Sequence, residues 1–227
     1  MESIYDTLLR LPLFAGVSHQ KMSEIVGKFP FHFLKYADGD TIIRSGEPYT
    51  HLTSVISGQI ITETESPDGQ FRAIQTLIAP NIIAPHYFFG RTTLSPHTAT
   101  ASGAAGILKI AKSDFLEILK SDSIFLFNYL NILSLQAQIS TNGSMALIDG
   151  SPERRIAFRI LTLTQPNSRN ITLHCKLGNL HSVFGLSKQA FIGAMNRLSE
   201  LGIINFTDAE INVNDRRELD ALLNSSR

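Results

Sequence analysis

Residues 176–198 read KLGNLHSVFGLSKQAFIGAMNRL, a stretch that predicts two short helices joined by a tight turn. Leu177, Leu180 and Phe184 are three or four positions apart, so their side chains share one face of the first helix. Gly185 permits the left-handed backbone of a sharp corner, and Leu186 can fill the angle between the helices. The stretch therefore predicts a helix-turn-helix, and an αα-hairpin with only a structural role is the alternative interpretation.

The second helix of this pair has a predicted buried face and a predicted outer face. Phe191, Met195 and Leu198 recur about once per turn and form the buried face. Ser187 is a residue type that caps helix N-termini. The outer positions near the N-terminus are Lys188, Gln189 and Ile192. Side chains in such positions can enter the major groove of DNA, where lysine contacts guanine or phosphate and glutamine pairs with adenine.

A pair of strands is predicted directly after these helices. Residues 201–204, LGII, end the helix with a glycine and begin a strand, residues 207–209 can turn, and residues 210–213 return. A helix-turn-helix followed by such a hairpin is typical of a winged helix. In that arrangement, the wing and the start of the first helix contact phosphate, which makes Lys176 a candidate phosphate contact.

Residues 31–110 have a different pattern, in which short β-branched and aromatic stretches alternate with turn signals. The signals are Ala37-Asp38-Gly39-Asp40, Ser45-Gly46-Glu47-Pro48, Ser57-Gly58 and Ser66-Pro67-Asp68-Gly69. A spacing of roughly ten residues between turns is typical of a sandwich or jelly-roll barrel. Residues 1–28 have helical spacing, with Ser18 as the expected cap of a helix.

Helical patterns return after residue 112, first as a short piece over 114–120 and then as a long helix over 124–148. The apolar residues of the long helix cover more than one face, which is wider than packing on one domain requires. They are Phe125, Tyr129, Ile132, Leu133, Leu135, Ile139 and Met145. We expect one face to meet a second copy of the chain, and a helix lying on its own domain is the alternative. Residues 149–152 predict a hinge, and a helix over 153–163 follows.

Composition sets the limits of the fold. The chain has 227 residues, 43% hydrophobic and 18% charged, which predicts two globular domains. No apolar run is long enough to cross a bilayer and no secretory signal is evident, so a cytoplasmic location is expected. Formal net charge is zero, but residues 151–227 carry +3 and residues 1–150 carry −3. The uneven charge permits binding to nucleic acid by the C-terminal part.

In this order of elements the chain resembles the cyclic-AMP receptor protein/FNR family of bacterial regulators. The similar motifs are Leu11-Pro12-Leu13-Phe14-Ala15-Gly16-Val17-Ser18, Gly39-Asp40, Ser45-Gly46-Glu47, Ile56-Ser57-Gly58 as a central turn, Phe89-Gly90, Gly185-Leu186-Ser187-Lys188-Gln189, and Arg197-Leu198 with Gly202-Ile203-Ile204. The resemblance implies an α+β chain with a β-roll (jelly-roll, cyclic-nucleotide-binding-like) sensor over 1–122. A long dimerisation helix and hinge over 123–149 and a winged helix-turn-helix over 150–227 would follow.

The function implied by the resemblance is sequence-specific DNA binding by a dimeric transcription regulator. The expected DNA-binding residues are Lys176, Ser187, Lys188, Gln189, Ile192 and Gly193. The expected partners are double-stranded DNA with a near-palindromic operator and a second copy of the chain. RNA polymerase is a further candidate partner, and no membrane is expected. Two recognition helices would lie about one DNA turn apart.

The effector loop departs from the family pattern. Cyclic-nucleotide-binding members place a glutamate after Phe-Gly and an Arg-Ser/Thr pair farther on, whereas this chain has Arg91 and Ser95-Pro96 there. A cyclic phosphate without its arginine would be a buried unpaired charge, so cyclic AMP is not the expected effector. The candidate pocket for another anion consists of Gly90, Arg91, Thr92, Thr93, His97 and Thr98. A surface arginine on a loop without a ligand is the alternative.

Other cofactors and functions have little support in the sequence. The single cysteine, Cys175, cannot by itself supply an iron-sulfur cluster or a zinc site. Seven scattered histidines leave haem sensing open, although they form no haem pattern. No nucleophile-base pair, HExxH motif or phosphate loop indicates an enzyme. Gly193 and Gln189 replace the arginine and glutamate of the family's recognition helix, so we expect a different operator. They also leave open a small-molecule or protein-interaction module that no longer reads DNA.

Overall fold

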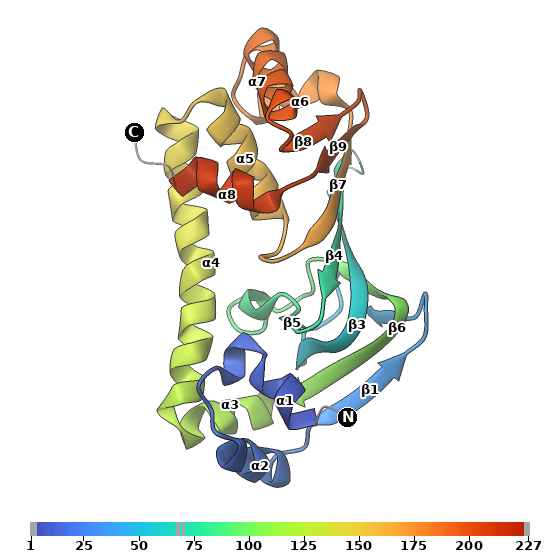
Figure 1. The fold of residues 1–227 in the computed structure, drawn as a ribbon, viewed down its shortest axis with the longest axis vertical. Coiled ribbons are helices and arrows are strands. Elements are labelled where there is room, and N and C mark those ends of the chain that lie inside the picture. The colour runs from blue at the N-terminus through green and yellow to red at the C-terminus, as the bar shows by residue number, and fades with distance from the viewer. Residues whose placement is uncertain (1–3, 67–68, 70, 225–227) are drawn as a thin grey trace. The chain divides into compact units, whose positions relative to one another are not determined.

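The computed structural model describes residues 4–66, 69 and 71–224, which form two compact units (Figure 1). The first unit consists of residues Met1–Ile61 and Leu77–Gln136, and the second of Thr62–Thr76 and Ala137–Arg227. The units meet in sequence at residues 61/62, 76/77 and 136/137. The long helix runs from one unit into the other, and the end of a hairpin in the N-terminal half belongs to the second unit.

Helices at both ends of the first unit surround one hydrophobic core. They are α1 (Ile4–Leu9), the short 3-10 helix η1 (Pro12–Phe14), α2 (His19–Lys28), α3 (Lys112–Ser121) and the beginning of α4 (Ser123–Asp149). Ser18 caps α2 as predicted, because its side chain accepts a hydrogen bond from the backbone N–H of Lys21. Phe14, Phe115 and Phe125 are fully buried in this core.

The strands of the first unit pair in antiparallel fashion. They are β1 (His32–Tyr36), β2 (Thr41–Ile43), β3 (His51–Glu65), β4 (Phe71–Ile78), β5 (Asn81–Ile82) and β6 (Thr98–Ala111), with the 3-10 helix η2 (Pro85–Tyr87) before β6. Both β1 and β2 pair with β6, and β5 pairs with β3. An antiparallel β-domain with helices was expected and is confirmed.

The predicted turn at Ser57-Gly58 is wrong, because both residues lie within β3, a continuous strand of 15 residues. Gly58 has a φ of +73°, and a Cβ atom at this position would collide with the carbonyl oxygen of Ala104 in β6. Glycine therefore lets the backbones of two long strands approach closely without a reversal of the chain.

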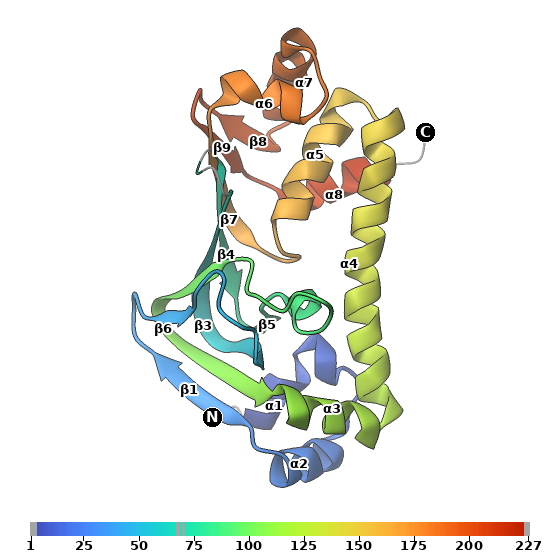
Figure 2. The ribbon, with the colours of Figure 1, turned by 180° about the vertical axis from the view of Figure 1, so that it is seen from behind.

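Helices and a small sheet build the second unit (Figure 2). After α4 come α5 (Pro152–Leu163), β7 (Arg169–Cys175), α6 (Leu177–Val183), α7 (Lys188–Glu200), β8 (Ile204–Phe206), β9 (Glu210–Val213) and α8 (Arg216–Asn224). Strand β9 pairs with both β7 and β8. Strand β7 and helix α8 were not predicted, although Ile171, Leu173 and Cys175 alternate in the manner of a half-buried strand.

The distal part of the β3–β4 hairpin joins this small sheet (Figure 1). Strand β4 pairs with β7 in an antiparallel register in which Ala73 lies opposite Leu173 and Phe71 opposite Cys175. Ala73 is fully buried in the core of the second unit. The turn signal at Ser66-Pro67-Asp68-Gly69 falls between β3 and β4, and its residues 67, 68 and 70 lie outside the described residues.

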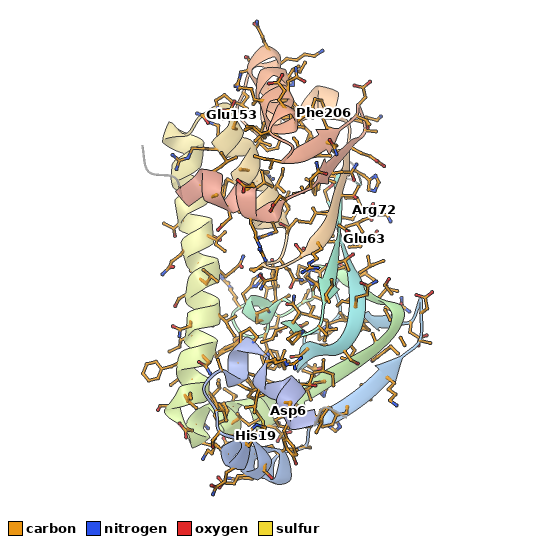
Figure 3. All side chains as sticks on the ribbon, viewed as in Figure 1. Asp6, His19, Glu63, Arg72, Glu153 and Phe206 are labelled. Atoms are coloured by element: carbon orange, nitrogen blue, oxygen red, sulfur yellow. The ribbon has the colours of Figure 1, made fainter. Side chains whose placement is uncertain are left out.

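Two side-chain contacts support the hairpin. The guanidinium of Arg72 forms an ion pair with Glu63 across it, with an Nε–Oε1 distance of 2.7 Å (Figure 3). Gln75 is almost fully buried, and its side-chain oxygen accepts a hydrogen bond of 2.7 Å from the backbone N–H of Gln165. The end of the hairpin therefore pairs with β7 and bonds to the loop at Gln165, both within the second unit.

Helix α4 is 27 residues long and continues past Asn142-Gly143. Phe125 and Tyr129 are buried in the first unit, and the hydroxyl of Tyr129 donates to the carbonyl oxygen of Pro85. Other apolar side chains of the same helix are exposed, namely Leu126, Phe127, Leu130 and Leu135. Within the described residues, no helix has the length and apolar character needed to cross a membrane.

Candidate nucleic-acid interface and sensor loop

The turn between α6 and α7 is built by local hydrogen bonds. Gly185 has a φ of +61°, as the predicted sharp corner requires. The backbone N–H groups of Gly185 and Leu186 donate to the carbonyl oxygens of Ser182 and His181. The Ser187 side chain accepts a 3.2 Å hydrogen bond from the N–H of Ala190 and so caps α7. The side chain of Leu177 lies outside the described residues, so its predicted face stays a prediction.

Helix α7 has one fully buried face. Phe191, Met195 and Leu198 are at most 2% exposed, as the spacing predicted. The rings of Phe191 and Phe184 stack with their centroids 5.5 Å apart, which fixes α7 against α6. The buried face therefore determines which residues of α7 point outward.

The outer face of α7 begins with polar side chains. Lys188 and Gln189 are exposed, and no hydrogen bond or ion pair joins either side chain to the part of the chain that the structure describes. Ile192 is 43% exposed, which is unusual for a large apolar residue in a packed helix. Near the start of α6, Lys176 is exposed and does not cap the helix with its side chain. These side chains are available to a ligand.

Gly193 leaves space on the surface of α7 that a side chain would otherwise fill. An ideal Cβ atom at residue 193 would meet only Nη1 of Arg197, at 3.5 Å, among the described atoms within 4 Å. The glycine thus leaves room on the helix surface, and a guanidinium from the next turn uses it.

An ion pair between α5 and α7 was not anticipated from the sequence. Nε and Nη2 of Arg197 both contact Oε1 of Glu153, which lies in the first turn of α5 (Figure 3). Burial alone would raise the pKa of Glu153, but hydrogen bonds from its own backbone N–H, Ser151 and Arg197, together with the Arg197 charge, lower it. Glu153 is therefore ionised at neutral pH and orients the arginine.

The other arginines of α5 are partly used within the fold. Arg154 donates from Nη2 to the carbonyl oxygen of Leu223, and Arg155 donates from Nη1 to that of Gly185. Both bonds tie α5 to neighbouring segments of the second unit. Arg159 is exposed on the same helix.

The predicted effector residues differ in exposure and in the hydrogen bonds that they make. Arg91 and Thr92 are exposed, and Gly90 has a φ of +105° at the start of the loop. Two other residues of the set make hydrogen bonds within the fold. The carbonyl oxygen of Thr93 accepts from the N–H of Tyr49, and the hydroxyl of Thr98 accepts from the N–H of Ser45.

His97 is buried, with 4% of its surface exposed. Burial, and after it the neighbouring His86, lowers the pKa of His97 to about 4. The hydroxyl of Ser95, also buried, donates to the carbonyl oxygen of His97 at 2.7 Å. At neutral pH this part of the loop therefore holds a neutral imidazole.

The described part of the chain offers no metal cluster and one buried thiol. No cluster of three or more His, Cys, Asp or Glu side chains suited to a metal occurs within residues 4–66, 69 and 71–224. Cys175 is buried in β7, and burial raises the pKa of its thiol to about 11. The thiol is therefore protonated at neutral pH and packs as a small apolar side chain.

Comparison with known proteins identifies the N-terminal domain. Residues 33–122 match the family model of the cyclic nucleotide-binding domain. A search of curated protein sequences gives no match. Among solved structures, the catabolite activator protein of Thermus thermophilus is 17% identical with a TM-score of 0.51, covering 93% of this chain and 98% of its own.

Further structures show a lower structural similarity. DNR from Pseudomonas aeruginosa is 22% identical with a TM-score of 0.48, and the match covers 98% of this chain and all of that one. FixK2 from Bradyrhizobium japonicum is 14% identical with a TM-score of 0.45, over 87% of this chain and all of that one. Residues 33–122 thus match the cyclic nucleotide-binding domain family, and the fold is similar to that of the catabolite activator protein, in agreement with the resemblance of the chain to the cyclic-AMP receptor protein/FNR regulators.

Proposed function

We propose that the chain is a sequence-specific, homodimeric DNA-binding transcription regulator whose sensor domain does not use cyclic AMP. The observation that carries the proposal is the outer face of α7. Lys188, Gln189 and Ile192 are exposed at the capped N-terminal end of a helix whose opposite face is buried. The β8–β9 hairpin follows this helix, as a wing follows the recognition helix in winged-helix proteins.

The roles of the individual residues follow from their chemistry. Lys188 would contact guanine or phosphate, and Gln189 would pair with an adenine edge. Ile192 would contact a thymine methyl group, and Lys176 at the start of α6 would contact phosphate. Ser187 would act by holding the end of α7 in place, since its hydroxyl already caps the helix.

A mobility-shift assay with a duplex selected from random DNA tests this role. Replacing Lys188 and Gln189 with alanine should abolish the preference for the selected sequence over a scrambled one. The matched control is Lys35→Ala with Gln20→Ala, which removes the same side-chain types from exposed positions of the first unit. If the Lys188 and Gln189 variant keeps its sequence preference, or if the native protein retains no duplex at low salt, α7 is not a recognition helix.

The dimer is proposed to form through α4. Leu126, Phe127, Leu130 and Leu135 are 41–62% exposed along this helix, and a stripe of exposed apolar side chains is typical of a helix that packs on a second copy. Analytical ultracentrifugation of Phe127→Asp should give a monomer. Leu116→Asp, an exposed leucine on α3, should remain a dimer. Equal masses for both variants at equal concentration would contradict this interface.

Cyclic AMP is excluded from the proposal on the geometry of the sensor loop. Arg91 is exposed where cyclic-nucleotide-binding relatives would place a glutamate, and Ser95 is buried and bonded where an arginine would be needed. We therefore propose an effector other than cyclic AMP, or none. Millimolar cyclic AMP should leave the melting temperature and the DNA affinity unchanged, and a saturable rise in melting temperature would refute this part.

A further inference from the structure

Arg197 extends back along α7 over the preceding turn. Side chains on a helix lean toward its N-terminus, so a long side chain at position 197 covers the surface near position 193. Its Nη1 atom lies 3.5 Å from the point that a Cβ atom at residue 193 would occupy. Because Gly193 has no side chain, the guanidinium takes the place of one.

This place belongs to the outer face of α7. Gly193 is four residues after Gln189 and three before Asn196, and both of these side chains are exposed. Residues at such spacings share one side of a helix. The guanidinium therefore lies between two exposed polar side chains in the middle of the face, away from the helix ends.

Glu153 holds the guanidinium by one edge. Both contacts to the carboxylate come from Nε and Nη2 of Arg197, and the Glu153 side chain is the more buried partner, with 16% exposed against 55%. A guanidinium has five N–H donors, and the contact with Glu153 uses only that of Nε and one of Nη2. Both hydrogens of Nη1 and the second hydrogen of Nη2 therefore remain available to a ligand. Nη1 and Nη2 together form the end-on fork that matches the O6 and N7 acceptors of guanine.

The geometry points to Arg197 as a DNA-contacting residue that reads a guanine edge in front of Gly193, with Glu153 as its positioning residue. This inference rests on the proposed role of α7 as a recognition helix. The glycine, the arginine and the glutamate act together: Gly193 leaves the space, Arg197 supplies the donors and Glu153 sets their direction.

Binding of the selected duplex at fixed salt, and of the same duplex with each guanine replaced by 7-deazaguanine, tests the inference. Arg197→Ala should weaken binding by about 10- to 100-fold and remove the effect of one 7-deazaguanine substitution. Arg197→Lys keeps the charge but lacks the fork, so it should lose the same base preference. Arg159→Ala removes an exposed arginine elsewhere in the second unit and should change binding less than about threefold.

A second pair of variants leaves the Glu153–Arg197 pair unmutated. Gly193→Ala places a Cβ atom at ordinary contact distance from Nη1 and should bind as the native protein does. Gly193→Leu fills the space and should displace the guanidinium, with the same loss of guanine preference as Arg197→Ala. This pair decides the matter if Arg197→Ala fails to fold, as judged by its thermal melting.

The outcomes separate the two proposals. If the native protein binds the duplex, Lys188→Ala weakens it and Arg197→Ala does not, only the present inference is overturned. If Arg197→Ala loses the same affinity for all DNA sequences, Arg197 contacts phosphate. If Glu153→Gln binds the duplex more tightly than the native protein, Glu153 keeps the arginine away from DNA. Either result would overturn the present inference. No binding by the native protein would refute the role of α7 itself.

Discussion

Within the second unit, the hydrogen bond between Gln75 of the β3–β4 hairpin and the backbone of Gln165 allows a quantitative test. Replacing Gln75 with alanine removes the oxygen that accepts from the N–H of Gln165 at 2.7 Å. Gln75 is 1% exposed and Gln165 is 8% exposed, so water cannot readily replace the lost acceptor. A buried donor left without a partner costs about 1–3 kcal/mol. We therefore expect the free energy of unfolding to fall by about 2 kcal/mol.

Urea denaturation measures this change, and a loss of about 2 kcal/mol corresponds to a fall of roughly 4–8 °C in melting temperature for a chain of this size. Hydrogen exchange in β7 (Arg169–Cys175) should accelerate together with that of β4, because the two strands are paired. Gln20→Ala, an exposed position on α2, is the control and should change stability by less than about 0.5 kcal/mol. If Gln75→Ala is as stable as Gln20→Ala, or if exchange in β7 is unchanged, the hairpin does not support the second unit as described.

Three further predictions concern single side chains. Ser187→Ala should lower the free energy of unfolding by about 1 kcal/mol by uncapping α7 and should weaken DNA binding. Ser18→Ala, which uncaps α2, should destabilise the protein by a similar amount and leave DNA binding unchanged, and equal DNA affinities of the two variants would contradict the positioning role of Ser187. The pKa of His97 is about 4 in the folded state against 6.5 for an exposed histidine, so the unfolded state binds the proton more tightly and the free energy of unfolding should fall by up to about 3 kcal/mol as pH drops from 6.5 to 4. In His97→Gln this dependence of the free energy of unfolding on pH should be absent from the denaturation curves, and an unaltered dependence would refute the assignment. Cys175 should react with a thiol reagent only at the rate of unfolding, because its thiol is buried with a raised pKa; rapid labelling of the native protein would disprove this.

Local signals in the sequence were sufficient to predict most helices of the fold. Ser18 and Ser187 each cap a helix at the expected residue, since capping depends on neighbours within one turn. A turn was predicted in the middle of β3 because a Ser-Gly pair is a common turn signal and the sequence does not show which strand lies opposite Gly58. Its actual role depends on the close approach of Ala104, which is distant in sequence.

The candidate site was predictable only in part. The burial of Phe191 and Met195 and the exposure of Lys188 and Gln189 follow from helical periodicity. The pair between Glu153 and Arg197 joins residues 44 positions apart, and periodicity within one helix contains no information about such a contact. Gly193 could be noted as unusual, but the side chain that covers it could be found only from the structure.

The pairing of β4 with β7 has a consequence for experiments that separate or exchange the two halves of such proteins. A fragment beginning near residue 150 would leave β7 with an uncovered edge, whose free N–H and C=O groups favour aggregation through strand pairing. A chimaera that replaces residues 1–122 would also replace Ala73, which packs in the core of the second unit. A functional exchange of sensors would therefore have to carry residues 62–76 of the recipient with it, and the part of the chain that is inherited as one module is discontinuous in sequence.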